Sequence, residues 1–324
     1  MWSVRCVAVL ALLAVWVSGA LAATTEFPNK PMRYIVATGP TGASDIIGRT
    51  VGAALSEGLG VQVVIDNRPG AGNTIGAEIA ANATPDGYTI FSCNIASLAV
   101  GPALYKKLGY DPERDFAMIG GIAVNPNIFT IQPSLPAKTI EEFVALAKKH
   151  PGKLNYASAG IGTSPQLSME LFRMQAQIDI VHVPYKGVGL ALVDLIGGRV
   201  EAMTSTVPAA LAAVRQGQIR ALGVTSTQRD KDLPDVPTIA ESGMPDFDVV
   251  SWQGLCTQAA VPEAALARLR AALAAALDTP ELRKRLADLG FQPRPMSAEK
   301  FAEFATAERA RWARVVKAMG INPQ

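Results

Sequence analysis

The sequence predicts an α/β fold made of two lobes, each a mainly parallel sheet flanked by helices. Short apolar runs alternate with helical segments along most of the chain, which is typical of parallel strands joined by right-handed crossover helices. The alternation forms two sets of about 100 residues each, an ordinary domain size, before and after Gly120-Gly121. The C-terminal part is mainly helical, and a tail of this kind braces a lobe more often than it forms a domain.

The first set contains strands expected at 32–38, 61–65 and 88–93. The turn 39–43 follows the first strand. Ser44 or Asp45 is expected to cap the next helix, whose apolar positions as far as Leu59 lie on one face. A shorter helix of small residues is expected over 74–82, after a loop rich in glycine and proline.

The second set repeats this pattern. Thr139 and Glu142 form a capping box for a helix that ends near His150. Ser164 is expected to be an N-cap with Pro165 at the first helical position. Further helices are expected at 188–197 and 208–216, and the strands of this set at 127–131, 154–158, 180–183, 200–203 and 219–224.

The C-terminal part adds a strand at 251–256 and helices that begin at Pro262, near 280 and near 298. We assign this part to the first lobe, so the chain crosses between the lobes near 122–126 and again near 223–228. The domain prediction is therefore 23–122 plus 228–324 for lobe 1 and 123–227 for lobe 2.

The N-terminus has the pattern of a secretory signal peptide, residues 1–22. A positive charge at Arg5 precedes the apolar run 6–17, and Ala20 and Ala22 have the spacing of a cleavage site. The alternative is a retained membrane anchor, but the run falls short of the roughly 20 residues that a spanning helix needs. We therefore expect export across the inner membrane to the periplasm, with a mature chain that begins near Ala23.

Charge and cysteine content narrow the classes of partner. The formal net charge is +2, and no basic tract interleaved with aromatic residues appears, so we expect no nucleic-acid partner. After cleavage Cys93 and Cys256 remain, both in apolar strand-like runs. Two free buried thiols are favoured, although a disulfide stays open because sequence gives no distance between them.

No pattern of catalytic or cofactor-binding residues emerges. The histidines are His150, at a helix C-terminus, and His182, within a strand. Ser158 lacks the first glycine of a nucleophile elbow, and no metal-ligand spacing occurs. The glycines in 70–76 are spaced one residue too far apart for a dinucleotide fingerprint. We therefore expect neither an enzyme nor a cofactor.

Neutral hydrogen-bond donors gather at the expected carboxyl ends of strands, where ligands bind in open α/β sheets. The loops 39–45 and 159–164 also begin helices, so their free N–H groups suit a carboxylate. Each loop alone is better explained as a tight turn with a cap. One such loop in each lobe favours a cleft for a small anion, with further donors in 92–97, 184–187 and 204–206.

A resemblance to a known family rests on many short motifs in order. They are Phe27-Pro-Asn-Lys-Pro-Met-Arg33, Ser44-Asp-Ile-Ile47, Asp66-Asn-Arg-Pro-Gly-Ala-Gly72, Pro85-Asp-Gly-Tyr88, Pro102-Ala-Leu-Tyr-Lys-Lys107, Pro133-Ser-Leu-Pro-Ala-Lys138, Pro151-Gly-Lys-Leu-Asn-Tyr-Ala-Ser-Ala-Gly160, Val181-His-Val-Pro-Tyr-Lys-Gly187 and Leu233-Pro-Asp-Val-Pro-Thr238. Over nearly the whole mature length the chain resembles the Bug-type (TctC-like) solute receptors of the tripartite tricarboxylate transporter family.

The resemblance implies a two-lobed periplasmic binding protein that closes around its ligand. Members of the family capture small carboxylates or related polar metabolites and deliver them to membrane permease subunits. The family pattern places the ligand carboxylate on loops that match 39–45 and 159–164. This chain departs from that pattern at Thr38 and Thr41-Gly42, at Gln166 and at Ser205. The acidic residue common at the position of Ser205 is missing, which favours a plain carboxylate over an amino acid.

From the strand ends and the resemblance together we expect ligand contacts from both lobes. Asp45 is expected to fix its loop rather than touch an anion, because like charges repel. The candidate ligand-binding residues are Thr38, Thr41, Gly42, Ser44, Asp45, Ser97, Gly162, Thr163, Ser164, Lys186 and Ser205.

Two functions fit these observations. The favoured one is a monomeric, non-catalytic receptor that captures a small organic acid for a tripartite transporter. The alternative is a periplasmic ligand sensor that presents its bound state to a membrane signalling protein.

Overall fold

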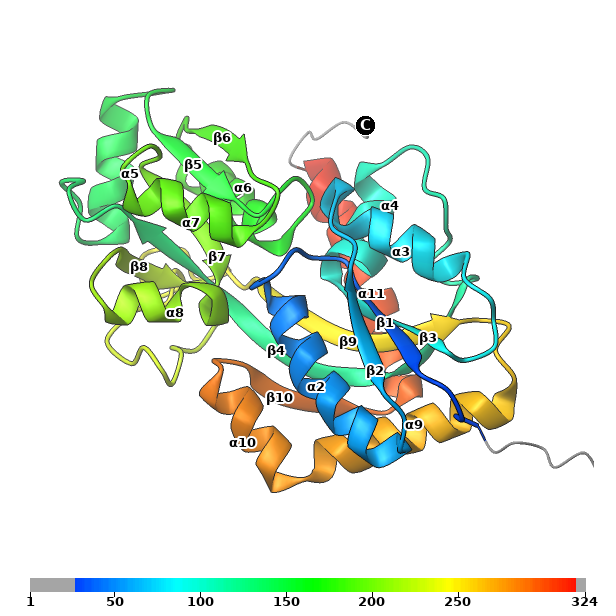
Figure 1. Ribbon diagram of the computed structural model, residues 1–324. Helices are drawn as coiled ribbons and strands as arrows, with labels where there is room; N and C mark the ends of the chain where they lie inside the picture. Colours follow the sequence, from blue (N-terminus) through cyan, green and yellow to red (C-terminus); the bar gives the residue numbers. More distant parts are fainter. Residues whose placement is uncertain (1–26, 319–324) are drawn as a thin grey trace, which may run out of the picture.

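The computed structural model describes residues 27–318, which fold into two lobes around one ten-stranded sheet (Figure 1). The strand order is β2-β1-β3-β9-β4-β7-β5-β6, and β8 and β10 also pair with β4. The predicted α/β class is confirmed. The expected signal peptide, 1–22, lies outside the described residues. Within those residues no helix combines the length and the apolar character needed to cross a membrane.

Lobe 1 carries the blue, cyan, orange and red elements of Figure 1, together with the yellow strand β9 and the yellow-orange helix α9. Its parallel strands are flanked by long helices, and β9 runs antiparallel to both β3 and β4. Its strands are β1 (Met32–Val36), β2 (Val63–Asn67), β3 (Thr89–Asn94), β9 (Val250–Gln258) and β10 (Gln292–Met296). Its helices are α2 (Ala43–Leu59), η1 (Ala71–Asn73), α3 (Thr74–Ala81), η2 (Ala96–Val100), α4 (Gly101–Leu104), α9 (Glu263–Asp278), α10 (Pro280–Asp288) and α11 (Ala298–Ala318).

Lobe 2 carries the green elements. Strand β5 pairs in parallel with β6 on one side and with β7 on the other, as expected for βα repeats. The strands are β5 (Asn155–Ser158), β6 (Val181–Pro184), β7 (Ala202–Thr206) and β8 (Arg220–Val224). The helices are α5 (Ile140–Lys149), α6 (Ser164–Ala176), α7 (Val188–Ile196) and α8 (Val207–Arg215).

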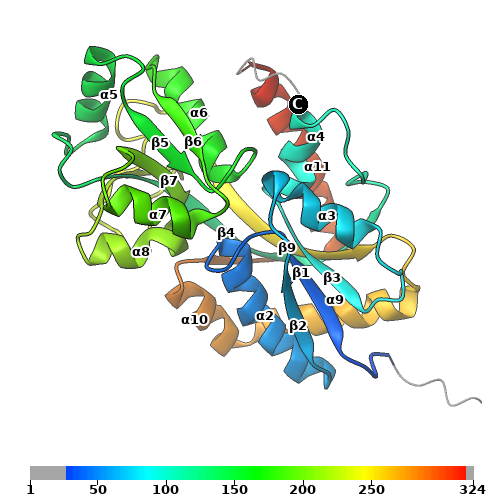
Figure 2. The same cartoon turned by 45° about the horizontal axis from the view of Figure 1, so that its top comes forward.

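The long strand β4 (Phe116–Ile131) joins the lobes. Residues 116–126 pair with β9, whereas 127–131 pair with β7 and β8 (Figure 2). The sequence predicted only 127–131, because Gly120, Gly121 and Pro126 disguise the first part. Bulges in the pairing with β9 lie beside Gly120 and Gly121, and Pro126 is the last residue of β4 that pairs with β9, opposite Val250. The predicted lobe boundaries, after 122 and after 227, remain a prediction.

Two further predictions of local structure were wrong. Strand β10 was missed because Pro293 and Pro295 read as a loop. It is an edge strand with an irregular register against β4, where proline is tolerated. Strand β7 begins and ends later than predicted, so 204–206 is strand rather than loop.

The N-caps of α2 and α6 each lie earlier in the chain than the sequence predicted. The N-cap of α2 is Gly42, which leaves Ser44 and Asp45 inside the first turn. The N-cap of α6 is Thr163, one residue before Ser164. By contrast, Thr139 caps α5 as predicted, because its hydroxyl accepts the Glu142 N–H at 3.2 Å.

Helix α11 braces the strands that run between the lobes. Phe301 and Phe304 pack edge-on against the fully buried Trp252 of β9. The indole N–H groups of Trp252 and Trp312 both donate to Glu308 Oε2, at 3.2 and 3.1 Å. Helix α11 therefore packs on β9, and the assignment of the whole C-terminal part to lobe 1 stays a prediction.

Candidate functional site

A cavity of about 620 Å³ lies between the lobes. Its walls come from the strand ends and helix starts of both lobes. Lobe 1 and the crossing strand β9 contribute Thr38, Gly42, Ser44, Asn73, Asn94, Ser251 and Gln253, and lobe 2 contributes Gly160, Thr163, Ser164, Lys186 and Thr206. The carboxyl ends of parallel strands meet at such an edge, so the fold itself gathers these polar groups.

Five helices point their N-termini at this cavity. Their N-cap residues all line it: Gly42 of α2, Asn73 of α3, Thr163 of α6, Gly187 of α7 and Thr206 of α8.

None of these five N-cap residues makes a side-chain capping hydrogen bond. By contrast, α5 and α10 begin elsewhere and are capped by the hydroxyls of Thr139 and Thr279. First-turn N–H groups have no partner inside a helix. The cavity therefore collects uncapped donors and the partial positive charge of several helices, which together favour an anion.

The lobe 1 wall is a chain of neutral side chains that hold one another in place. Ser44 Oγ donates to Gln253 Oε1 at 2.9 Å and accepts from Asn94 Nδ2 at 3.2 Å. Asn94 Oδ1 in turn accepts the N–H groups of Ala96 and Ser97. Beside this network, Thr38 Oγ1 is buried with no protein partner. A ligand atom or a water is the partner that would satisfy it.

The lobe 2 wall is a short segment, 159–163, which we call the cleft loop. Thr163 Oγ1 donates to the Gly160 carbonyl at 2.6 Å, and Gly162 N–H donates to Gln166 Oε1 at 3.2 Å. Ser164 Oγ accepts from Asn127 Nδ2 at 2.5 Å, so its own proton is free for a ligand. The cleft loop is thus fixed from within, and the Ser164 hydroxyl directly after it is the donor that faces the cavity.

Lys186 is the only charged side chain among the described residues that line the cavity. None of the described residues in its wall carries a carboxylate. Tyr105 is half-buried in the wall, and burial raises the pKa of its phenol, so it stays a neutral donor. Neutral donors, helix ends and one ammonium therefore set the electrostatics of the site.

The structure brings six predicted residues together in the cavity wall: Thr38, Gly42, Ser44, Thr163, Ser164 and Lys186.

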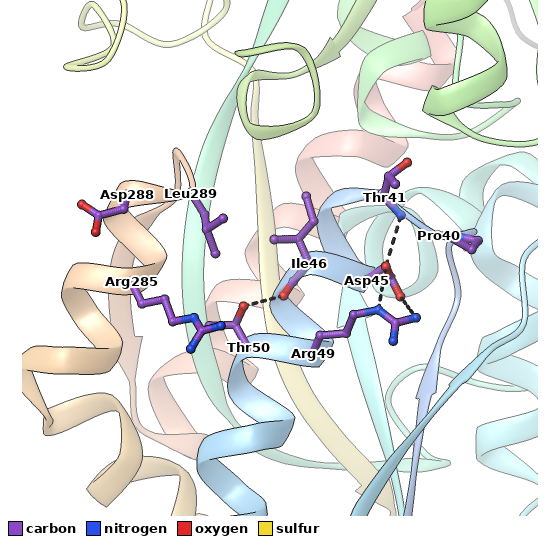
Figure 3. Close-up of a pocket in the computed structure, with 9 residues that line it drawn as sticks. All are labelled: Pro40, Thr41, Asp45, Ile46, Arg49, Thr50, Arg285, Asp288 and Leu289. Carbon is purple, nitrogen blue, oxygen red and sulfur yellow. Dashed lines mark hydrogen bonds and ion pairs between the residues drawn. The ribbon is translucent and has the colours of Figure 1, made fainter. Parts of the chain in front are cut away.

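Two predicted residues lie on the outer side of the first loop. Thr41 and Asp45 line a separate surface pocket of about 640 Å³ between α2 and α10 (Figure 3). Asp45 Oδ2 accepts the Thr41 N–H and the Arg49 side chain, both at 3.1 Å, and Asp45 Oδ1 accepts from Asn67. Asp45 therefore fixes its loop, in the role that the sequence suggested, and its carboxylate raises the pKa of Arg49.

Three more predicted residues are absent from the cavity wall. Ser97 Oγ bonds to the backbone of Asn94 and closes the turn after β3. Gly162 donates its N–H to Gln166. Ser205 is fully buried within β7, where its hydroxyl has no protein partner. Because 204–206 is strand, Ser205 pairs with Ile128 instead of ending a loop at the cleft.

Sequence reasoning missed Asn73, Ser251 and Gln253 as lining residues, and it included Thr206 only within the donor range 204–206. Ser251 and Gln253 come from β9, far along the chain, and only sheet order brings them beside Ser44. The available signal was polar residues at alternate positions in a buried strand, Ser251-Trp-Gln253.

The described residues contain no cluster of three or more histidine, cysteine or acidic side chains that is placed to hold a metal. Cys93 and Cys256 are both free and buried, and burial raises the pKa of the Cys256 thiol. His182 lies beside Ser158, but neither lines the cavity, and Ser158 is fully buried. The cavity thus offers hydrogen bonds and no nucleophile–base pair.

Comparisons with known proteins show the family to which the chain belongs. The model of the tripartite tricarboxylate transporter family receptor matches residues 47–321. A UPF0065 protein from the tcbD-tcbE intergenic region of Pseudomonas sp. (strain P51) is 35% identical over 297 residues, which is 91% of this chain and 88% of that protein. Protein BugT of Bordetella pertussis is 32% identical over 295 residues, 91% of this chain and 90% of BugT.

Two similar solved structures are named with a small carboxylate, adipate in one and malate in the other. Rpa4515 of R. palustris with adipate is 33% identical, with a TM-score of 0.89 over 92% of this chain and 100% of that chain. MatC from Rhodopseudomonas palustris with bound malate is 34% identical, with a TM-score of 0.85 over 90% of this chain and 100% of MatC. The chain therefore belongs to the tripartite tricarboxylate transporter receptor family, as a Bug-type solute-binding receptor rather than an enzyme.

Proposed function

We propose that this receptor captures a small carboxylate without an amine in the interlobe cavity, in the periplasm, and delivers it to the membrane permease subunits of a tripartite transporter. The observation that carries the proposal is the set of five uncapped helix N-termini around the cavity. The cavity volume of about 620 Å³ is ordinary for a site that holds a small metabolite.

The lack of acidic side chains among the described lining residues supports a ligand without an amine. A ligand ammonium needs a carboxylate partner when it leaves water, and the described lining residues include no aspartate or glutamate. Asp45 is turned away and already accepts hydrogen bonds from Thr41, Arg49 and Asn67. Adipate and malate, named with the two similar structures, are amine-free carboxylates.

The available interactions suffice for useful affinity. A hydrogen bond to a charged group contributes roughly 1.5–3 kcal/mol, and an exposed helix N-terminus up to about 1 kcal/mol. Micromolar binding requires about −8 kcal/mol. A few donors from each lobe reach that value after the cost of association, without any buried ion pair.

We further propose that the ligand draws together lobes made of 23–122 plus 228–324 and of 123–227, and that the receptor is a monomer. Contacts from both lobes favour the closed arrangement, because an open cleft leaves half of them unmade.

A thermal-shift screen against mono-, di- and tricarboxylates, including adipate and malate, tests the ligand class. A ligand at 100 times its Kd stabilises the receptor by about 2.7 kcal/mol. Succinate and aspartate form a matched pair that differ by one amine, and we expect stabilisation by succinate to exceed that by aspartate. Tighter binding of aspartate, or of uncharged solutes, would contradict the proposal.

Transport is tested separately. Deleting the gene should abolish uptake of the ligand found in the screen at low external concentration, and a plasmid copy should restore it. Normal uptake combined with loss of a transcriptional response to the ligand would favour a sensor instead.

A further inference from the structure

His182 bonds to the residue that anchors the cleft loop. Its Nε2 lies 2.7 Å from the hydroxyl of Ser158, the last residue of β5. That hydroxyl also lies 3.2 Å from the nitrogen and 3.3 Å from the carbonyl oxygen of Gly160. Ser158 is fully buried and does not line the cavity, whereas Gly160 does.

We propose that His182 is a positioning residue, which fixes the cleft loop through Ser158 by accepting the hydroxyl proton at Nε2. The proposal rests on the proposed function in one respect: it takes the conformation of the cleft loop described above to be the one that binds ligand.

Counting protons assigns the direction of each bond. A serine hydroxyl has one proton to donate, and the Gly160 N–H can only donate, so Ser158 Oγ accepts from it. The Gly160 carbonyl already accepts from Thr163 Oγ1 at 2.6 Å and from Thr163 N–H at 3.4 Å. The Ser158 proton therefore goes to His182 Nε2, which must be unprotonated, with the imidazole proton on Nδ1.

Protonation of His182 reverses this arrangement. Nε2 then becomes a donor to Ser158, and the hydroxyl proton has only the Gly160 carbonyl to bond, at the longer distance of 3.3 Å. The change reaches Gly160, which has a φ of +130°, lies outside regular structure and is held by hydrogen bonds to Ser158 and Thr163. Protonation of the His182 imidazole therefore changes the hydrogen bonds of Gly160, which lines the cavity.

The surroundings of His182 favour its neutral form. Its ring stacks on Tyr156 of β5, with centroids 4.7 Å apart and an interplanar angle of 19°. The charged group that acts on His182 is Glu170 of α6, which bonds to Arg173 at 2.9 Å. Tyr156 also donates to Glu170. Burial lowers the pKa of His182, and the Glu170 carboxylate opposes that shift only in part.

The test uses the ligand-free receptor, so it does not depend on knowing the ligand. Hydrogen exchange of the Gly160 amide is compared in wild type, Ser158→Ala, His182→Leu and the double variant. We expect exchange to accelerate about tenfold in each single variant, the effect of one lost hydrogen bond. The double variant should be no faster than Ser158→Ala, because both changes break the same link.

A conservative variant and a matched control separate positioning from general damage. His182→Gln keeps a neutral acceptor at the position of Nε2 and should restore protection close to wild type. In the wild type, the chemical shift of the Gly160 amide should change with pH as His182 titrates. His182→Gln should remove this change. The control His150→Gln, at the exposed end of α5, should retain it. In the wild type, ¹⁵N shifts of His182 should report the tautomer protonated at Nδ1.

Several results would overturn the proposal. They are a His182 tautomer protonated at Nε2, unchanged Gly160 exchange in Ser158→Ala, or a His182→Gln variant that behaves like His182→Leu. If the loop results hold but no carboxylate binds, the positioning role stands and the proposed ligand class fails.

Discussion

Thr225, which follows β8, is joined to Asn127 of β4 through both its backbone and its hydroxyl. The Asn127 N–H donates to Thr225 Oγ1 at 2.8 Å, and the Thr225 N–H donates to the Asn127 carbonyl at 2.9 Å. The same hydroxyl donates to the Val249 carbonyl at 2.5 Å, just before β9 begins. The fully buried Thr225 hydroxyl therefore bonds to both Asn127 of β4 and Val249, and the two ends of the segment 225–249 lie close together.

Replacing Thr225 by valine keeps the shape of the side chain but removes this hydroxyl. The Asn127 N–H and the Val249 carbonyl lose a buried partner, so we expect a loss of about 1–3 kcal/mol in the free energy of unfolding, measured by urea denaturation. Thr225→Ser keeps the hydroxyl and should lose clearly less. Equal losses in the two variants would mean that packing, not hydrogen bonding, makes this residue important.

Ser164 and Ser168 offer a matched pair for testing direct ligand contact. Both hydroxyls accept from Asn127 Nδ2, at 2.5 and 2.7 Å, but only Ser164 lines the cavity. We expect Ser164→Ala to weaken binding of the screened carboxylate about tenfold or more, the effect of one hydrogen bond to a charged group. Ser168→Ala should leave the Kd nearly unchanged in isothermal titration. Similar losses in both would place the effect in the Asn127 network.

The contribution of Lys186 should be modest, because its side chain is exposed and water screens its charge. We expect Lys186→Ala to weaken anion binding less than Ser164→Ala does, and to reduce its salt dependence. Lys153→Ala, at the opposite end of β5, serves as the control for net charge. Complete loss of binding in Lys186→Ala alone would refute recognition by neutral donors and helix ends.

Ligand binding should make the receptor more compact. Polar groups from both lobes line the cavity, so a carboxylate that contacts both favours closure about the crossing segments. Small-angle scattering should show a smaller radius of gyration at saturation than without ligand. An unchanged radius at saturation would argue for a receptor that is closed before it binds.

Stability should depend on pH through His182. Its pKa is lowered in the folded state, so the unfolded chain binds more protons as the pH falls below about 6.5. The free energy of unfolding should therefore decrease as the pH falls below that value, with a slope of at most about 1.4 kcal/mol per pH unit from one group. His182→Gln should remove this part of the slope. An identical slope in both proteins would assign it to other groups, such as Asp230 and Asp248, whose pKa values are raised by burial.

Much of the fold was predictable because the local signals are strong. Alternation of strands and helices predicted α2, α5, α9 and α11, since their apolar faces repeat with helical spacing. Strand β10 and the first part of β4 were not predictable in the same way. Their prolines and glycines suit loops, and only pairing with neighbouring strands makes them extended.

The features of the site also separate into those that the local sequence predicts and those that only tertiary contacts decide. The sequence by itself determined that donors at 39–45 and 159–164 follow strands and begin helices, because turns and helix starts depend on neighbours in the chain. Only the tertiary structure decided which of those residues face the cavity. A turn of helix carries Asp45 to the outside, and the order of strands brings Gln253 beside Ser44 and His182 beside Ser158. These pairs are distant in sequence, so sheet order and helix packing, rather than any local pattern, set their contacts.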